Sequence, residues 1–548
     1  MKNYIKLIQS GIVMLTLLIL ASCSTEKSNL TATPKDAGFV MVVDGKALKE
    51  KGNINSISES KIYKKAIAEI SDDEMADFKQ FEYLFKDTKE SGIAINEEFI
   101  MFMKMVEGTP MVGFNFQVLD KAKVDALFTI VTEKEDDLEV LNSDGVSYIV
   151  NDKAIIAWNE AQLLVLAQQE MAPEALLNNA KTLLSQSASE SISSNSNYSD
   201  FYAKRKDVSF WFNYDLFLDN MPPAQQMMIT SQLPFSMKGT FFFGYISFEK
   251  GQVVAEYESI MNDEMKAFIK DYQFINDDFD TDVLKFMPKT SYANAEISLN
   301  LFDYYHMFLD MYKEKQVDTE VYTKQVEQEL GVTVDDLLKS FSGEMAISLH
   351  GISMKEETGM SFEIDENGEY KMVEKTEMKP ELLYSAVVKY NNDMVWEIIE
   401  TKAGEIGLVK QDGYYSISQA DVYLGYVDNT LLVTNDLELI KKDMADGSID
   451  PNLKSTEVAD YLKKFPTYLE LNMDLDQYPE EVREYIKNQD KEKSDIFLKF
   501  MSTYKRLQVM PTDIYSAKIV LELNNKDKNS LDVILHDLDD ASELISKN

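Results

Sequence analysis

Two stretches of the chain align with each other without a gap: "DGVSYIVNDKAIIAWNEAQLLV" at residues 144–165 and "DGYYSISQADVYLGYVDNTLLV" at residues 412–433. Both begin with Asp-Gly and both end in Leu-Leu-Val. Alternating apolar and β-branched residues are typical of strands, and Asp-Gly is typical of a tight turn between strands. Each stretch therefore predicts two strands joined by a turn and entered through an Asp-Gly turn.

Four further pairs of similar stretches occur in a consistent order, which predicts that one structural unit is present twice. They begin at Ser91 and Ser342, Met111 and Leu383, Val208 and Thr467, and Phe241 and Tyr515. The acidic stretch "NDDFDTDVLKFMPKTS" at residues 276–291 separates the two copies. We therefore expect an α+β repeat 1 at residues 38–276 and an α+β repeat 2 at residues 277–548.

Strand patterns outnumber helical patterns in both predicted repeats, and their short connections favour antiparallel pairing. Helical spacing of apolar residues predicts helices within residues 60–87 and 301–341. The Ser- and Asn-rich residues 185–200 are expected to form a loop, and residues 355–380 an exposed hairpin that turns at Asn367-Gly368. The expected fold class is α+β, with two tandem repeats that each form a mainly antiparallel β-sheet with packed helices.

The N-terminus predicts secretion and attachment to a lipid. A positively charged start precedes an apolar run that ends in Leu20-Ala21-Ser22-Cys23, which resembles the bacterial lipobox. We expect residues 1–22 to be a lipoprotein signal peptide, cleaved between Ser22 and Cys23. Residues 23–37 are then the lipidated cysteine and a flexible tether. An ordinary signal peptide with an incidental cysteine is the alternative interpretation.

The composition is that of a large, acidic, globular protein. The 548 residues include 55 Lys and Arg against 94 Asp and Glu, so the formal net charge is −39. A field of this sign repels nucleic acid, and we expect no nucleic-acid partner. Hydrophobic residues make up 45% of the chain, which is enough for two domains, yet no run after the N-terminal segment is long enough to cross a bilayer.

The residues that commonly bind metals do not form a recognisable site, so we expect no metal and no cofactor. The three histidines lie far apart and lack cysteine partners. Three aspartates at alternating positions resemble the start of a calcium loop, but Val283 replaces its glycine and Lys289 its glutamate. A second acidic segment is explained by an ordinary hairpin turn. These candidate residues are His306, His350 and His536; Asp278, Asp280 and Asp282; and Asp365, Asn367 and Glu369.

Motifs for nucleophilic catalysis are almost entirely missing, and no catalytic residue is predicted. Ser58-Glu59-Ser60-Lys61 fits Ser-x-x-Lys, but the companion Lys-Thr-Gly motif of penicillin-recognising enzymes does not occur. A carboxylate pair for glycoside hydrolysis stays open, because such a pair meets only in the fold. Trp158, Trp211 and Trp396 lie inside apolar patterns, which favours core packing over a carbohydrate platform.

The lipobox, the tether and the duplicated body together resemble an uncharacterised family of Bacteroidota lipoproteins that contain a tandem domain of unknown function. The resemblance rests on the opening "GFVMVVDGKAL", the Asp-Gly unit and the segment "DVLKFMPKTSYANAEISL", and it covers most of the chain. It implies a location and an architecture. It implies no activity, ligand or site residue.

Three classes of function remain open. A large body without a reactive constellation favours a non-enzymatic binding or scaffolding module, anchored to the membrane by its lipid and presenting its surface to an envelope protein or ligand. The alternatives are an envelope hydrolase with a carboxylate or metal site that sequence does not reveal, and a periplasmic carrier of an apolar ligand. The residues after Cys23 favour an outer-membrane anchor that faces the periplasm, with the cell surface as the alternative.

Overall fold

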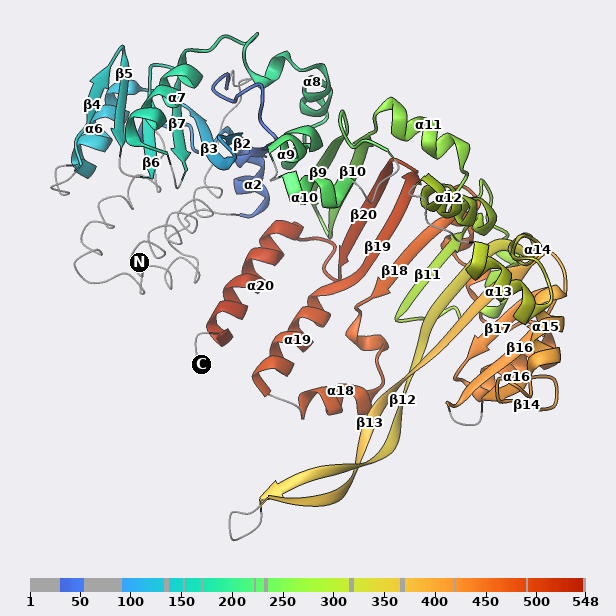
Figure 1. Ribbon diagram of the computed structural model, residues 1–548. Coiled ribbons are helices and arrows are strands. Elements are labelled where there is room, and N and C mark those ends of the chain that lie inside the picture. The colour runs from blue at the N-terminus through green and yellow to red at the C-terminus, as the bar shows by residue number, and fades with distance from the viewer. Residues whose placement is uncertain are drawn as a thin grey trace. The chain divides into compact units, whose positions relative to one another are not determined.

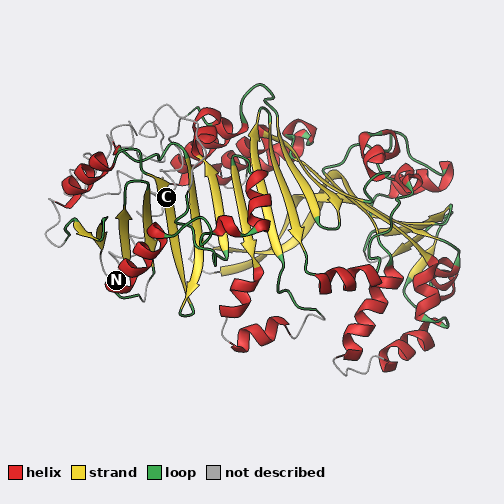
Figure 2. Ribbon diagram, turned by 90° about the horizontal axis from the view of Figure 1, so that it is seen from above, coloured by secondary structure: helices red, strands yellow, loops and turns green. Residues whose placement is uncertain are grey.

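The protein is described here from a computed structural model, in which two compact units are distinguished by their internal contacts. Unit 1 comprises Met1–Met265 and Asn525–Asn548, and unit 2 comprises Lys266–Asn524. Both combine helices with antiparallel strands, which confirms the predicted α+β class (Figures 1 and 2). The structure describes residues 30–53, 91–132, 138–150, 153–168, 171–220, 223–230, 235–314, 320–364, 370–417, 420–488 and 491–545.

The strands of unit 1 pair in the order β4-β5-β6-β7-β3-β2-β1-β8-β9-β10, always antiparallel. Neighbours along the chain are mostly neighbours in the sheet because short turns join them. The strands are β1 (Phe39–Asp44), β2 (Glu98–Val106), β3 (Thr109–Gln117), β4 (Leu141–Ser143), β5 (Val146–Val150), β6 (Ala154–Trp158), β7 (Gln162–Ala167), β8 (Val208–Asn213), β9 (Phe241–Glu249) and β10 (Gln252–Ile260).

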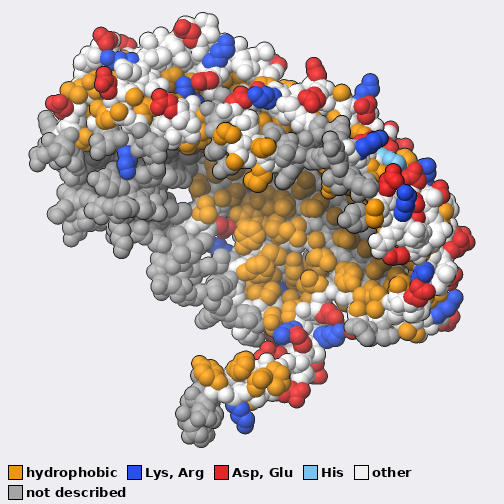
Figure 3. Space-filling view, in the orientation of Figure 1, with side chains coloured by type: hydrophobic (Ala, Val, Ile, Leu, Met, Phe, Trp, Pro, Cys, Tyr) orange, Lys and Arg blue, Asp and Glu red, His pale blue; other side chains and the backbone are white. Residues whose placement is uncertain are grey.

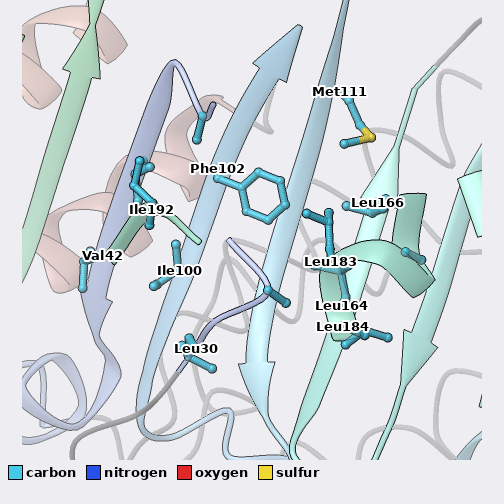
Figure 4. Packing of buried hydrophobic residues seen from close by; sticks show 14 of the residues in the cluster. Leu30, Val42, Ile100, Phe102, Met111, Leu164, Leu166, Leu183, Leu184 and Ile192 are labelled. Carbon is cyan, nitrogen blue, oxygen red and sulfur yellow. The ribbon is translucent and has the colours of Figure 1, made fainter. Parts of the chain in front are cut away.

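Helices cover both faces of the unit 1 sheet. One hydrophobic cluster lies between the strands and the helices α7 and α8, as Figure 4 shows for Phe102, Leu164 and Leu183. A second cluster joins the opposite face to α2, α6 and the C-terminal helix α20. The helices are α2 (Gly45–Lys51), α6 (Lys121–Thr132), α7 (Pro173–Ser185), η2 (Ile192–Ser194), α8 (Ser196–Ala203), α9 (Tyr214–Asn220), α10 (Pro223–Thr230), α11 (Asp263–Asp271, which continues into unit 2) and α20 (Ser530–Ile545).

The strands of unit 2 pair in the order β14-β15-β16-β17-β13-β12-β11-β18-β19-β20, again always antiparallel. The exceptionally long β12 and β13 form a hairpin that extends far beyond the other strands (Figure 1). The strands are β11 (Ala293–Ser298), β12 (Phe341–Ile364), β13 (Tyr370–Tyr390), β14 (Leu408–Lys410), β15 (Tyr415–Ile417), β16 (Val422–Val427), β17 (Thr430–Thr434), β18 (Thr467–Asn472), β19 (Tyr504–Asp513) and β20 (Ser516–Leu523).

The main core of unit 2 lies on one face of its sheet, and a smaller cluster joins α15 to β14, β15 and β16 on the other face. Ala346, Val387 and Leu432 on the strands pack in the main core with apolar residues of η3, η4, α16 and α17. Within the described ranges of the chain, no helix is long and apolar enough to cross a membrane. The helices are η3 (Thr281–Phe286), α12 (Leu301–Glu314), α13 (Glu320–Leu330), α14 (Val334–Ser340), α15 (Met394–Lys402), α16 (Leu437–Asp446), η4 (Leu453–Ser455), α17 (Glu457–Leu462), η5 (Leu475–Gln477), α18 (Glu480–Lys487) and α19 (Lys491–Thr503).

The Asp-Gly turn of the first quoted stretch is confirmed, but the number of strands after it was wrong. Asp144 and Gly145 join β4 to β5 with φ angles of 56° and 81°, values typical of a two-residue hairpin turn that favours glycine. Residues 144–165 then contain β5, β6 and the start of β7, which is three strands instead of two.

The predicted loop at residues 185–200 was also wrong in part, because it contains η2 and the first turn of α8. Its polar residues cap these helices: the Asn195 side chain accepts hydrogen bonds from the backbone N–H groups of Asn197 and Tyr198. The predicted helices in residues 301–341 and the hairpin around residues 355–380 are confirmed. The predicted helix at 60–87, Ser58–Lys61 and the turn at 365–369 lie outside the described residues.

Candidate binding surface

The central strand of unit 2, β11, has an apolar side and a polar side. Ala293, Ala295 and Ile297 alternate with Asn294, Glu296 and Ser298, so the two sets point to opposite faces of the sheet. The polar side chains are the buried ones. An antiparallel sheet usually packs its apolar face on the core and leaves its polar face in water, so the arrangement along β11 is reversed.

The apolar side of β11 is continued by the neighbouring strands in register. Ala295 pairs with Ile347 and Leu469, and Leu469 pairs with Val509. We call this surface the open face. It consists of Ala293, Ala295, Ile297, Met345, Ile347, Leu349, Tyr384, Ala386, Val388, Thr467, Leu469, Leu471, Leu507, Val509, Ile519 and Leu521.

No residue of the open face is buried, and several large side chains on it are exposed. Ile347 is 56% exposed and Leu469 is 42% exposed. Figure 3 shows hydrophobic side chains gathered over the strands β18, β19 and β20. The open face spans six strands, about 24 Å, and three rows, about 13 Å, judged from ordinary strand spacing and rise. An apolar patch of this size on a protein surface commonly marks a binding site.

The middle of the open face carries the smallest side chains, along β11. Ala293 and Ala295 there have single methyl groups as side chains. Ile347 and Leu349 of β12 rise on one side, and the leucines of β18 rise on the other. Apart from the hydroxyl groups of Tyr384 and Thr467, the open face carries no side-chain hydrogen-bonding group, and the backbone groups of its strands are paired in the sheet.

Unit 1 carries larger side chains along its central strand. Its central strand β1 carries Phe39 and Met41 on the side that faces Phe212 and Phe210 of β8. The Phe212 ring also lies 6.2 Å from the Phe242 ring on β9. The central strand of unit 1 therefore carries large side chains, whereas β11 carries small ones in the middle of the open face.

The covered face of the unit 2 sheet holds a buried carboxylate pair. The amide of Asn294 donates to both Glu296 oxygens at 2.9 and 3.1 Å, while Glu470 on the adjacent strand accepts from Tyr468 at 2.6 Å. Burial, only partly offset by the Asn294 hydrogen bonds, raises the pKa of Glu296 to about 8, and the charge of Glu470 acts in the same direction. Because Glu296 is almost completely buried, a glycoside cannot reach the pair.

A Ser-His-Asp chain lies on the same covered face. The Ser385 hydroxyl is 3.2 Å from His350 Nδ1, and His350 Nε2 is 3.3 Å from Asp436 Oδ2. The His350 hydrogen bond is the largest influence on Asp436 and lowers the pKa of its carboxyl. Ser385 is buried, and Asp436 already caps α16 by accepting from the N–H groups of Glu438 and Leu439. The chain therefore ties β12, β13 and α16 together and offers no accessible nucleophile.

The other histidines, and Asp280 and Asp282 of the predicted calcium-like aspartates, have ordinary partners. His306 Nε2 lies 3.1 Å from Asp335, and the mostly exposed His536 lies 3.6 Å from Asp532. Asp280 forms an ion pair with Lys389, and Asp282 pairs with Lys454 at 2.6 Å. No group of residues suited to a metal occurs in the described part of the chain. Trp158 and Trp211 are completely buried, as predicted, and Trp396 stacks on Tyr426 at 5.1 Å.

The structure does not describe the residues of the predicted lipid site. Ser22 and Cys23 lie outside the described ranges, as do Asp365, Asn367 and Glu369. Sequence reasoning missed the open face. The signal that could have found it is "ANAEIS" at residues 293–298, where small apolar residues alternate with polar ones, but alternation does not reveal which side is covered.

The fold and this surface define an α+β protein with an open, apolar sheet face. The family model described as a domain of unknown function (DUF4836) matches residues 30–531, so the chain belongs to this family. No curated protein matched the chain. Among solved structures, two crystal forms of TP0453, III and IV, each share 10% identity with it. They cover 44% and 42% of this chain and 81% and 79% of their own, with TM-scores of 0.25 and 0.24.

Proposed function

We propose that the protein is a non-enzymatic binding module of the cell envelope that holds an apolar ligand on the open face of unit 2. One observation carries this proposal: an apolar surface extends over six strands, and helices cover the opposite face of the sheet. Among the functions considered from the sequence, the carrier of an apolar ligand is the one this surface favours. The ligand class is a hydrocarbon chain, such as the acyl chain of a lipid.

The chemistry of the open face selects a hydrocarbon over a folded protein. Protein interfaces commonly place about one hydrogen bond in every 100–200 Å². The open face offers almost no group that could form one. A chain of about fourteen methylenes gains roughly 6–11 kcal/mol if half to all of its surface is buried. After an association cost of about 4 kcal/mol, nearly complete burial leaves about 7 kcal/mol, which corresponds to a dissociation constant of about 10 μM.

A fluorescent fatty-acid probe tests this proposal. Ile347→Glu places a charge in the middle of the open face and should weaken binding at least tenfold. The matched control is Ile406→Glu, because Ile406 is 59% exposed but lies outside the open face. Ala295→Phe should also weaken binding, since it places a large ring in the middle of the open face, on the side of β11 that points away from the buried polar residues. Equal affinities of all three variants and the unaltered chain would refute the assignment of the ligand to this surface.

We further propose that the two units are copies of one ancestral unit. They match the predicted repeats 38–276 and 277–548 except at residues 266–276, which belong to unit 2, and residues 525–548, which belong to unit 1. The support is topological: raising each strand number of unit 1 by ten reproduces the strand order of unit 2. The five pairs of similar stretches in the sequence agree with this. The large side chains along β1 and the small side chains along β11 would then reflect divergence after duplication.

The proposed location follows from the N-terminal sequence. We propose an envelope lipoprotein of the kind found in Bacteroidota, cleaved after Ser22, lipidated on Cys23 and held at the outer membrane facing the periplasm. Mass spectrometry of the N-terminal peptide should show acylation that Cys23→Ser removes. Protease added to intact cells should leave the chain uncut, whereas rapid digestion would place it on the cell surface.

A further inference from the structure

The far part of the β12–β13 hairpin stands apart from the rest of the unit 2 sheet. Beyond residues 344–349, β12 pairs only with β13, and beyond residues 385–389, β13 pairs only with β12. We call residues 351–364 and 370–382 the arm. Figure 1 shows the arm extending well beyond the strands of the sheet. A two-stranded ribbon of this kind has little stability of its own in water.

The arm has one mainly apolar face and one charged face. The register places the apolar residues of both strands on the same side: Ile352, Met354, Met360, Phe362, Tyr370, Met372, Met378, Pro380 and Leu382. Four polar residues interrupt this side in the middle of the arm: the carboxylates of Glu356 and Glu374, and the hydroxyl groups of Thr358 and Thr376, which lie 2.9 Å apart. The opposite side carries ion pairs, among them Lys375–Glu377 at 2.6 Å and Lys379–Glu357 at 2.8 Å.

The apolar face of the arm is strongly exposed at its far end. Phe362 is 68% exposed and Tyr370 is 78% exposed. Figure 3 shows hydrophobic side chains gathered on the far part of the arm. Large aromatic and methionine side chains seldom stay in water to this extent on an extended ribbon unless a further surface covers them.

A β-bulge makes the apolar face of the arm continuous with the open face. Leu349 pairs with Tyr384, but the next pair is Gly351 with Leu383, so His350 is an extra residue in β12. The extra residue shifts the alternation of β12 by one. As a result, Ile352 and Met354 lie on the same side of the hairpin as Ile347 and Leu349, whereas an unbulged strand would turn them to the charged side.

We propose that the arm lies with its apolar face on a lipid bilayer and forms the route by which a hydrocarbon chain passes between the bilayer and the open face. This proposal rests on the proposed function, because a route matters only if the open face holds hydrocarbon. Its basis is the continuity of the two apolar surfaces across the bulge. A hydrocarbon chain that moves along the arm to the open face contacts apolar side chains over most of that path.

The structure of the arm also defines how it lies on the membrane. Both edges of the ribbon carry unpaired backbone groups, which cannot be buried in the hydrocarbon interior without a large penalty. The arm therefore lies in the interfacial region and does not span the bilayer. The overall net charge of −39 disfavours anionic lipids, so the arm should prefer zwitterionic surfaces such as phosphatidylcholine.

Dyes placed on the two sides of the arm test the proposal. The full chain with Cys23→Ser receives one new cysteine, because the sequence contains no other. A polarity-sensitive dye is attached at Met372→Cys or Phe362→Cys on the apolar face, or at Lys375→Cys on the charged face as the matched control. Phosphatidylcholine vesicles with a nitroxide-labelled lipid are then added.

The expected result is a blue shift and several-fold quenching of the dye at positions 372 and 362, and no change at position 375. Absence of any response at 372 and 362 would overturn the proposal, as would equal responses on both sides of the arm. Binding of the fatty-acid probe is measured on the same samples. If the probe binds but the dye does not respond, the proposal for the arm is wrong and the proposed function is unaffected. If the probe does not bind, the proposed function itself is contradicted.

Discussion

Replacing Glu296 by glutamine should make unit 2 more stable at alkaline pH and leave it almost unchanged at acidic pH. Glu296 is buried on the covered face of the sheet, and burial raises the pKa of its carboxyl to about 8 from 4.5. The folded state therefore holds the proton over a range of pH in which the unfolded state has released it. Glutamine keeps the shape and one of the two hydrogen bonds from Asn294 but has no carboxyl proton to lose.

The sign and size of the effect follow from this difference in pKa. A raised carboxyl pKa contributes stability that is fully present below about pH 4.5 and is lost as the pH rises toward about 8. Each unit of pKa difference corresponds to about 1.4 kcal/mol, so the unaltered chain should lose on the order of 4–5 kcal/mol across this interval relative to Glu296→Gln. Other titrating groups are common to both proteins and cancel in the difference.

Urea unfolding at about pH 5 and about pH 8.5 measures the effect, with hydrogen exchange of β11 peptides assigning the transition to unit 2. The control is Glu374→Gln, because Glu374 lies on the exposed arm and its replacement should leave the difference near zero at both pH values. A free-energy difference between Glu296→Gln and the unaltered chain that does not change with pH would refute the reasoning. It would mean that Glu296 is ionised in the folded protein.

Three further predictions concern other parts of the fold. Burial raises the pKa of Asp443 to about 7, and neither carboxyl oxygen has a hydrogen-bond partner in the described part of the chain. Asp443→Asn should therefore stabilise unit 2 increasingly from about pH 4 to about pH 7, as measured in thermal melts. Gly145→Ala should lower the stability of unit 1 by about 1 kcal/mol in urea unfolding, because Gly145 has a φ of 81°; an unchanged midpoint would contradict the assigned turn. Ser385→Ala should leave any ester hydrolysis by the purified protein unchanged, because Ser385 is buried; a loss of activity would show that the Ser-His-Asp chain is catalytic.

Sequence patterns predicted the local features of the fold because local chemistry determines them. The Asp144-Gly145 turn needs positive φ angles, and the helical spacing within residues 301–341 is set by the residues themselves. The count of strands in residues 144–165 failed because short strands separated by two or three polar residues resemble a single longer pattern. The capping role of Asn195 was hidden in a composition that is equally typical of a loop.

The candidate site could not be predicted, because it depends on which face of a sheet the helices cover. The alternation in β11 shows that Ala295 and Glu296 lie on opposite faces, and the usual arrangement would bury the alanine. Tertiary packing of η3, η4, α16 and α17 reverses this. The partners of Ala295 on β12 and β18 lie 52 and 174 positions away in sequence, so the open face exists only once the strands are paired.

The central claim is that a hydrocarbon chain lies on the open face of unit 2, and photo-crosslinking tests it most directly. A fatty acid with a diazirine in its chain is bound to the purified protein, activated by light and located by mass spectrometry of the peptides. We predict crosslinks in peptides that contain Ala295, Ile347 and Leu469, and their loss when an excess of unlabelled fatty acid is present. Crosslinks confined to unit 1, or spread over the surface without competition, would contradict the account.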